Sequence, residues 1–148
     1  VTFVNAPRLA QDRGVTVAVV TAPESPSHRS VVSVRGIFAD GMVHSVSGTL
    51  SGPAQVQKLV EIDGRHFDLR AEGQAIFMEY PDRPGVMGTV GSLLGDVGVN
   101  IEAAQISQTT EGTDAIMMLR VDRAVTGQVL TAIGSSVGAR TVRSVTFG

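Results

Sequence analysis

Residues 75–98 read AIFMEYPDRPGVMGTVGSLLGDVG and change from one structural pattern to another at a single corner. The first six residues are apolar enough to predict a strand, and Pro81 ends it because proline donates no hydrogen bond to a sheet. Pro84 then favours the first turn of a helix, and Gly98 favours its end. Apolar residues recur in that helix at spacings of three and four, which predicts one buried face made of Val86, Val90, Leu93, Leu94 and Val97.

The remainder of the second half continues to alternate between strand and helix patterns. Apolar and polar residues alternate over 99–106 and over 115–121, on either side of a turn at 109–112, which predicts two paired strands. A second helical stripe runs from Val125 to Val137, and a last strand is expected over 141–147. The order strand, helix, strand, strand, helix, strand predicts a ferredoxin-like βαββαβ unit.

The first half has the pattern of an antiparallel sheet. Apolar-rich arms surround Asp40-Gly41 and Asp63-Gly64, and these dipeptides tolerate the positive φ of a tight hairpin turn. The β-branched run from Val15 to Val20 is typical of a further strand, and a short helix is expected over residues 6–13. We therefore predict an α+β fold with a boundary near residue 73.

The composition excludes several classes of function. With 43% hydrophobic and 18% charged residues, the 148-residue chain is ordered and has room for one domain or two small ones. Twelve basic and fourteen acidic side chains balance to −2, which disfavours nucleic acid and anionic membranes as partners. No apolar run approaches the ~18 residues of a membrane span. We expect a cytoplasmic piece of a longer protein.

Catalytic and metal-binding patterns are missing from the sequence. The absence of cysteine excludes a thiolate metal site, and the three histidines stand on separate segments without ligand spacing. The glycines between Gly88 and Gly95 do not form the G-x-G-x-x-G nucleotide pattern, and no serine occupies a nucleophile elbow. The sequence therefore predicts no catalytic residue, no metal and no cofactor of its own.

The corner from Asp82 to Gly85 suits an amino acid ligand. The amides at a helix N-terminus carry a positive partial charge that attracts a carboxylate, and Gly85 leaves them uncovered. Asp82 can accept the hydrogen bonds of an ammonium group. These groups match an α-amino acid zwitterion, but the same pattern also fits a capping Asp82 and a Gly85 that only permits tight packing.

The stretch from Tyr80 to Gly88, followed by Gly98-Val99-Asn100-Ile101, resembles the signature of the ACT domain, a βαββαβ module that binds amino acids. Upstream, residues 28–32, 47–50 and 61–70 resemble the allosteric substrate-binding domain of long-form D-3-phosphoglycerate dehydrogenases. The resemblance implies that residues 1–73 are this intervening domain, incomplete at its N-terminus. It implies that residues 74–148 are an ACT domain.

This family catalyses the NAD-dependent first step of L-serine synthesis, and L-serine inhibits it by binding between the ACT domains of two subunits. The resemblance therefore implies allosteric regulation, a homodimer or homotetramer, and NAD only in domains outside this chain. The serine-contacting positions that it implies are Tyr80, Asp82 and, from the partner chain, Asn100. The backbone N–H groups of Gly85 and Val86 complete the predicted effector site, since they can donate to the ligand carboxylate.

The resemblance also implies a second site for a phosphorylated substrate or another phosphate-like anion, at Lys58, His66, Arg70 and Arg120. A two-residue turn at Asp63-Gly64 would pair Glu61 with His66 and Gln57 with Arg70, which leaves Lys58 on the opposite face. One pocket would then need a β-bulge or a second subunit. Solvated strand charges are the alternative, and Arg65 is another possible contributor.

Two other functions fit the same residues. One is the small chain of an iron–sulfur L-serine dehydratase, whose cluster another chain would have to supply. The other is a structural dimerisation module without a working ligand site.

Overall fold

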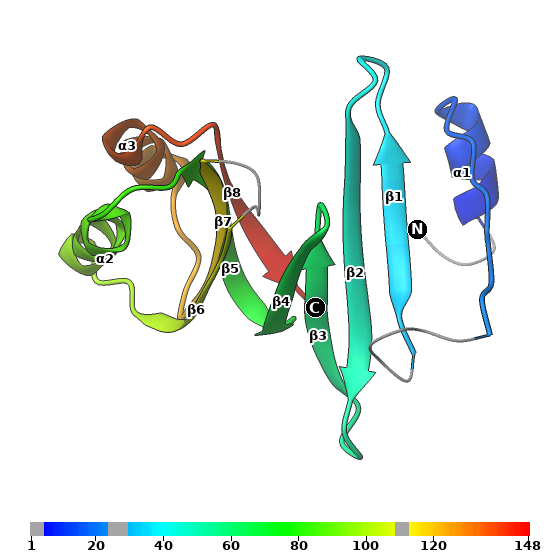
Figure 1. The fold of residues 1–148 in the computed structure, drawn as a ribbon, viewed down its shortest axis with the longest axis horizontal. Coiled ribbons are helices and arrows are strands. Elements are labelled where there is room, and N and C mark those ends of the chain that lie inside the picture. The colour runs from blue at the N-terminus through cyan, green and yellow to red at the C-terminus, as the bar shows by residue number, and fades with distance from the viewer. Residues whose placement is uncertain (1–4, 24–29, 109–112) are drawn as a thin grey trace.

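The computed structural model describes residues 5–23, 30–108 and 113–148, which form an α+β fold of two antiparallel sheets and accompanying helices (Figure 1). The predicted turn at 109–112 and the His28-Arg29 part of the upstream motif lie outside the described residues. The fold class predicted from the sequence is confirmed.

The first sheet contains β1 (Val32–Ile37), β2 (Val43–Ser51), β3 (Val56–Ile62) and β4 (Arg65–Arg70), in that spatial order. Both predicted hairpins are present. Asp63 and Gly64 have φ values of 49° and 77°, so both central residues of the second turn are left-handed. This backbone matches the twist of the flanking strands and explains why an Asp-Gly pair occupies the turn.

The second sheet contains β5 (Gly73–Pro81), β6 (Ile101–Gln108), β7 (Asp114–Val121) and β8 (Thr141–Phe147), in the order β6-β7-β5-β8. The connecting helices α2 (Val86–Asp96) and α3 (Gly127–Val137) cover one face of this sheet (Figure 1). The βαββαβ unit is therefore confirmed. Val97 is half exposed rather than on the buried stripe, because α2 ends at Asp96.

Both faces of the second sheet are buried. One face packs against the helices through Ile76, Met78 and Tyr80. The opposite face packs against β3 and β4, where Ile116 and Met118 join a cluster with Leu59, Ile62, Phe67 and Leu69. The two sheets share this apolar contact, so the division into domains at residue 73 stays a prediction.

The contact covers only half of the first sheet. Val34 lies opposite Val46, which lies opposite Ile62, so all three share the face that is turned toward the second sheet. Ile62 is buried, but Val34 is 68% exposed. The β1–β2 half of this apolar face is therefore uncovered in the described residues.

Two local predictions are wrong. The run from Val15 to Val20 forms no strand, because no described strand pairs with it and β-branched residues favour a strand only where a ladder and burial support them. The short helix α1 (Ala6–Asp12) before it forms as predicted. Pro84 lies in a turn before α2 rather than in its first turn, since Gly85 is the N-cap.

The contact between the sheets can be tested at Leu69, which is 3% exposed. Leu69→Ala leaves a cavity there, so we expect the free energy of unfolding to fall by about 2–5 kcal/mol. The measurement is urea denaturation, with the exposed Val20→Ala as the control, expected to change stability by less than about 0.5 kcal/mol. Equal stability of Leu69→Ala and the parent chain would contradict the shared core.

Candidate functional site

Asp82 is held at the point where β5 ends. Its backbone N–H donates to the carbonyl of Thr113 at 2.6 Å, which ties the corner to the start of β7. Its carboxylate accepts a hydrogen bond from the side-chain amide of Gln108, at the end of β6. No side chain caps α2, so Asp82 does not act as a helix cap. The carboxylate stays at the surface beside the first turn of α2.

Gly85 is required by the backbone. Its φ of 89° lies in the left-handed region, and a Cβ added to it would meet no atom within 4 Å. The glycine therefore serves the turn rather than tight packing. The N–H and the hydroxyl of Thr89 both donate to the Gly85 carbonyl, at 3.0 and 3.1 Å. With no acidic residue in the first turn, the helix N-terminus keeps its positive partial charge.

Two other predicted effector residues are part of the core. Tyr80 is 1% exposed and packs under the helices, and the side chain of Val86 is buried beside it. Burial, and then the charge of Asp82, raise the pKa of the Tyr80 hydroxyl. Val86 can therefore offer a ligand only its backbone N–H. The buried ring of Tyr80 packs in the core next to the corner and does not reach its surface.

Asn100 lies far from this corner. It precedes β6, whereas Gln108, the partner of Asp82, is the last residue of β6. Eight strand residues at about 3.3 Å each separate the two ends by roughly 26 Å. Asn100 and Asp122 hold each other through two hydrogen bonds, from the Asn100 N–H to the Asp122 carboxylate at 2.9 Å and from the Asp122 N–H to the Asn100 carbonyl at 3.1 Å. One chain therefore does not bring Asn100 to Asp82.

Strand β6, which separates Asn100 from the Asp82 corner, is at the edge of its sheet. Among the described residues β6 pairs only with β7, so no strand ladder forms on its outer edge, and β4 contacts β6 through a hydrogen bond from the Asp68 N–H to the Gln105 side chain at 2.7 Å. Ile106, two residues before the end of β6, is 45% exposed. A free strand edge with an exposed apolar side chain is a surface on which another strand can pair.

The predicted pairing of β3 with β4, on which the anion site depends, is partly corrected by the structure. Glu61 lies opposite His66 as predicted, but Lys58 rather than Gln57 lies opposite Arg70. A register shift between Leu59 and Glu61 supplies the bulge that the single-pocket prediction needed. Lys58 consequently shares one face of the sheet with His66 and Arg70.

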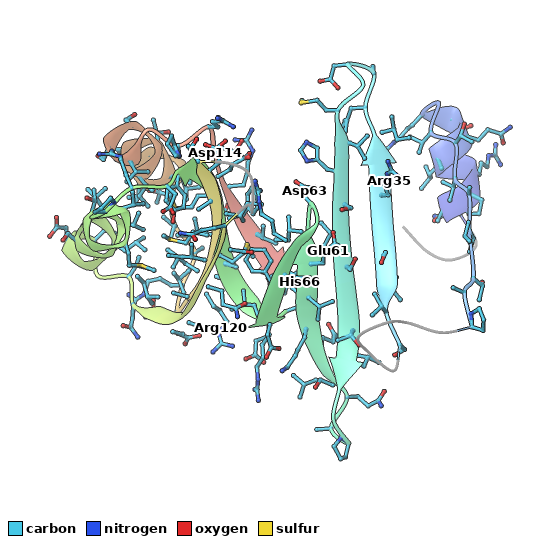
Figure 2. The ribbon with its side chains drawn as sticks, in the orientation of Figure 1. Arg35, Glu61, Asp63, His66, Asp114 and Arg120 are labelled. Carbon is cyan, nitrogen blue, oxygen red and sulfur yellow. The ribbon has the colours of Figure 1, made fainter. Side chains whose placement is uncertain are left out.

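Arg120 joins this group from the second sheet. Figure 2 labels Arg120 at the second sheet. Its Nη1 lies 2.6 Å from Oε1 of Glu72, and the same oxygen lies 3.7 Å from Nη1 of Arg70. Lys58 pairs with Asp68 at 2.6 Å. Arg65 lies opposite Ile62 on the other face and contacts Glu79 at 4.0 Å, so it is apart from the group. The structure brings Arg70 and Arg120 together, each with a carboxylate already beside it.

Several partners of these residues are not apparent in the sequence. Gln108, Glu72 and Glu102 reach their partners across strands that are distant in the chain. Glu61 accepts hydrogen bonds from Ser47, from the N–H of Gly64 and from Ser45, and these hold its pKa below the ordinary value. The alternation of Ser45 and Ser47 along β2 was a signal for this polar face.

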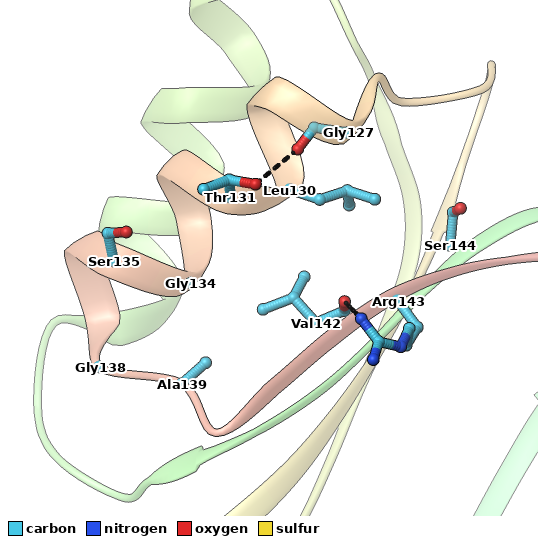
Figure 3. A pocket seen from close by; sticks show the side chains of 10 residues that line it. All are labelled: Gly127, Leu130, Thr131, Gly134, Ser135, Gly138, Ala139, Val142, Arg143 and Ser144. Atoms are coloured by element: carbon cyan, nitrogen blue, oxygen red, sulfur yellow. Dashed lines mark hydrogen bonds between the residues drawn. The ribbon is translucent and has the colours of Figure 1, made fainter.

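A hollow in the second half of the chain lies elsewhere. It has a volume of about 720 Å³ between α3 and β8 and is lined mainly by small residues such as Gly127, Thr131 and Ser135 (Figure 3). None of the predicted site residues lines it. Within the described ranges, no three His, Cys, Asp or Glu residues are grouped to hold a metal ion. None of the helices there is long and apolar enough to cross a membrane.

Comparisons with known proteins agree with the resemblance found in the sequence. Residues 75–137 match the model of the ACT domain. The chain is 52% identical over 145 residues to D-3-phosphoglycerate dehydrogenase of Mycobacterium leprae, covering 98% of this chain and 28% of that protein. For the proteins of the same name from Mycobacterium bovis and Bacillus subtilis, identity is 57% over 139 residues and 32% over 120 residues.

The alignments to the latter two proteins cover 94% and 81% of this chain, and 26% and 22% of those proteins. The chain thus spans about a quarter of the length of these curated relatives. Residues 75–137 belong to the ACT domain family, in a chain that is similar over nearly its whole length to a segment of D-3-phosphoglycerate dehydrogenase.

Proposed function

We propose that this chain is a regulatory part of a cytoplasmic D-3-phosphoglycerate dehydrogenase that binds L-serine between two ACT domains. The NAD-dependent catalysis of serine synthesis belongs to parts of the enzyme outside these 148 residues. The observation that carries the proposal is the placement of Asp82 and Asn100 at opposite ends of the edge strand β6.

This placement fits a two-fold symmetric pair. If the free edges of two β6 strands associate in antiparallel fashion, the start of each strand meets the end of the other. Asn100 of the partner subunit then lies beside the Asp82 corner, and two equivalent sites form. A symmetric contact of this kind needs only one surface, which is the free edge around Ile106.

The groups at the corner match the ends of L-serine. The carboxylate of Asp82 accepts from the ammonium group, and the N–H groups of Gly85 and Val86 face the ligand carboxylate at the start of α2. Asn100 of the partner subunit can both donate to and accept from the remaining polar groups. Tyr80 keeps the floor of the corner rigid, since its ring is buried.

The polar face of the first sheet is the proposed second site. Lys58, His66 and Arg70 share this face because of the register shift between β3 and β4, and Arg120 adjoins it. Converging cations are what a phosphate group requires. We assign this face to a phosphate-like anion or a phosphorylated substrate.

Serine sensing is tested by calorimetric titration with L-serine and D-serine. We expect selective binding of L-serine by the parent chain, and at least about tenfold weaker binding by Asp82→Asn and Asn100→Ala, because each loses a hydrogen bond to a charged or polar ligand group. Asp96→Asn, with the same charge change on exposed helix surface, should bind as the parent does.

Mixing the two variants gives a sharper result. A dimer of one Asp82→Asn chain and one Asn100→Ala chain contains one site with both native residues and one site with neither. Binding should return to half of the sites in those mixed dimers. If mixing restores nothing, the site is not shared between subunits, and if the parent dimer binds no serine, the chain is a dimerisation module only.

The association surface is tested at Ile106. Ile106→Lys replaces an exposed apolar side chain on the proposed two-fold contact by a charged one, which loses its water when the edges pair, so we expect dissociation to monomers in sedimentation velocity. Unfolding in urea should be nearly unchanged at equal monomer content, because Ile106 is half exposed. A dimer of undiminished stability would place the interface elsewhere.

The anion site is tested by following amide shifts of residues 66–72 during titration with inorganic phosphate at constant ionic strength. Arg70→Gln should weaken binding by about tenfold, the effect of losing one charge-assisted hydrogen bond. Arg13→Gln, at an exposed arginine that ends α1, is the matched control. Equal affinity of Arg70→Gln and the parent would remove Arg70 from the site.

A further inference from the structure

The proposed anion site already contains carboxylates of its own. A single oxygen of Glu72, Oε1, lies 2.6 Å from Nη1 of Arg120 and 3.7 Å from Nη1 of Arg70. On the other side of Arg120, Oε2 of Glu102 accepts from Nε at 3.0 Å. The guanidinium of Arg120 is thus bracketed by two carboxylates, and Glu72 occupies the position between the two arginines.

The backbone directs both carboxylates to this place. Glu72 lies in the short connection between β4 and β5, where the chain passes from one sheet to the other. Glu102 is the extra residue of a register shift in β6, since Ile101 pairs with Val121 and Ala103 with Arg120. A bulge changes the direction of a side chain relative to its neighbours, and here it brings Glu102 to Arg120.

The side chains of Glu72 and Glu102 can also move away from Arg120. The side chain of Glu72 is 53% exposed and that of Glu102 is 43% exposed, whereas Arg120 is only 19% exposed. Exposed ion pairs contribute little to stability, so rotation of either glutamate into solvent has a small free-energy cost. The arginine stays in place while its partners can move.

We propose that Glu72 and Glu102 act as internal competitors of the anion and set the affinity and selectivity of this site. The inference rests on the anion site proposed above. Lys58, Arg70 and Arg120 face Asp68, Glu72 and Glu102, so the group has no net positive charge. An incoming anion must displace a carboxylate to reach the arginines.

This competition favours a dianion. A monovalent carboxylate ligand offers the arginines only what Glu72 already provides. A phosphate group carries more charge and three acceptor oxygens, so it can engage Arg120 and also Arg70, which Glu72 reaches only at 3.7 Å. The glutamates thus reject weak anions and admit phosphate-like ones.

The test compares phosphate and acetate titrations of Glu72→Gln, Glu102→Gln and the double variant with the parent chain, read from the amide shifts of residues 66–72. Glutamine keeps the size of glutamate and removes the charge. We expect phosphate to bind about two- to fivefold tighter to each single variant, the range that exposed ion pairs contribute, and acetate to begin to bind. Asp96→Asn controls for the change in net charge.

The sign of the effect decides between two roles. If Glu72 instead positions the arginines for the ligand, Glu72→Gln will bind phosphate more weakly than the parent, and the competitor role is refuted while the anion site stands. If neither the parent nor the double variant shifts residues 66–72, the anion site itself is absent and the inference falls with it.

Discussion

The structure depends on the burial of β7 on both faces. Met117 and Leu119 point into the core under the helices, while Ile116 and Met118 point into the contact with the first sheet. Because side chains alternate along a strand, a slip of one residue would exchange these two sets and carry Arg120 to the other face. The same strand that holds the two layers together therefore determines where the arginine of the polar site lies.

The register shift between β3 and β4 has a comparable role in the first sheet. The turn at Asp63-Gly64 sets Glu61 opposite His66, and an unbroken ladder would continue with Gln57 opposite Arg70. Between these pairs β3 has one residue, Val60, where β4 has two, and this shift places Lys58 opposite Arg70 and keeps Leu59 opposite Leu69 in the apolar contact. The same irregularity therefore keeps the apolar side chains in the contact between the sheets and places the basic side chains on one face.

Most of the fold could be predicted from the sequence because it follows from local sequence patterns. Asp-Gly turns, helical stripes and glycine stops depend on neighbouring residues, and they located the hairpins and the βαββαβ unit. The bulge depends on tertiary packing, and the failure of Val15–Val20 to form a strand depends on a missing neighbour. For the site, residue types indicated Asp82 and the cations. Their carboxylate and amide partners come from distant strands, which spacing along one chain does not reveal.

The hydrogen bond from Gln108 to Asp82 changes how a ligand would enter the corner. The carboxylate is already engaged, so an arriving ammonium group exchanges one partner for another instead of meeting a bare charge. An exchange of this kind has a small net enthalpy and little tendency to trap the ligand. If the corner binds the proposed ligand, binding there would be readily reversible, as a regulatory site that follows ligand concentration requires.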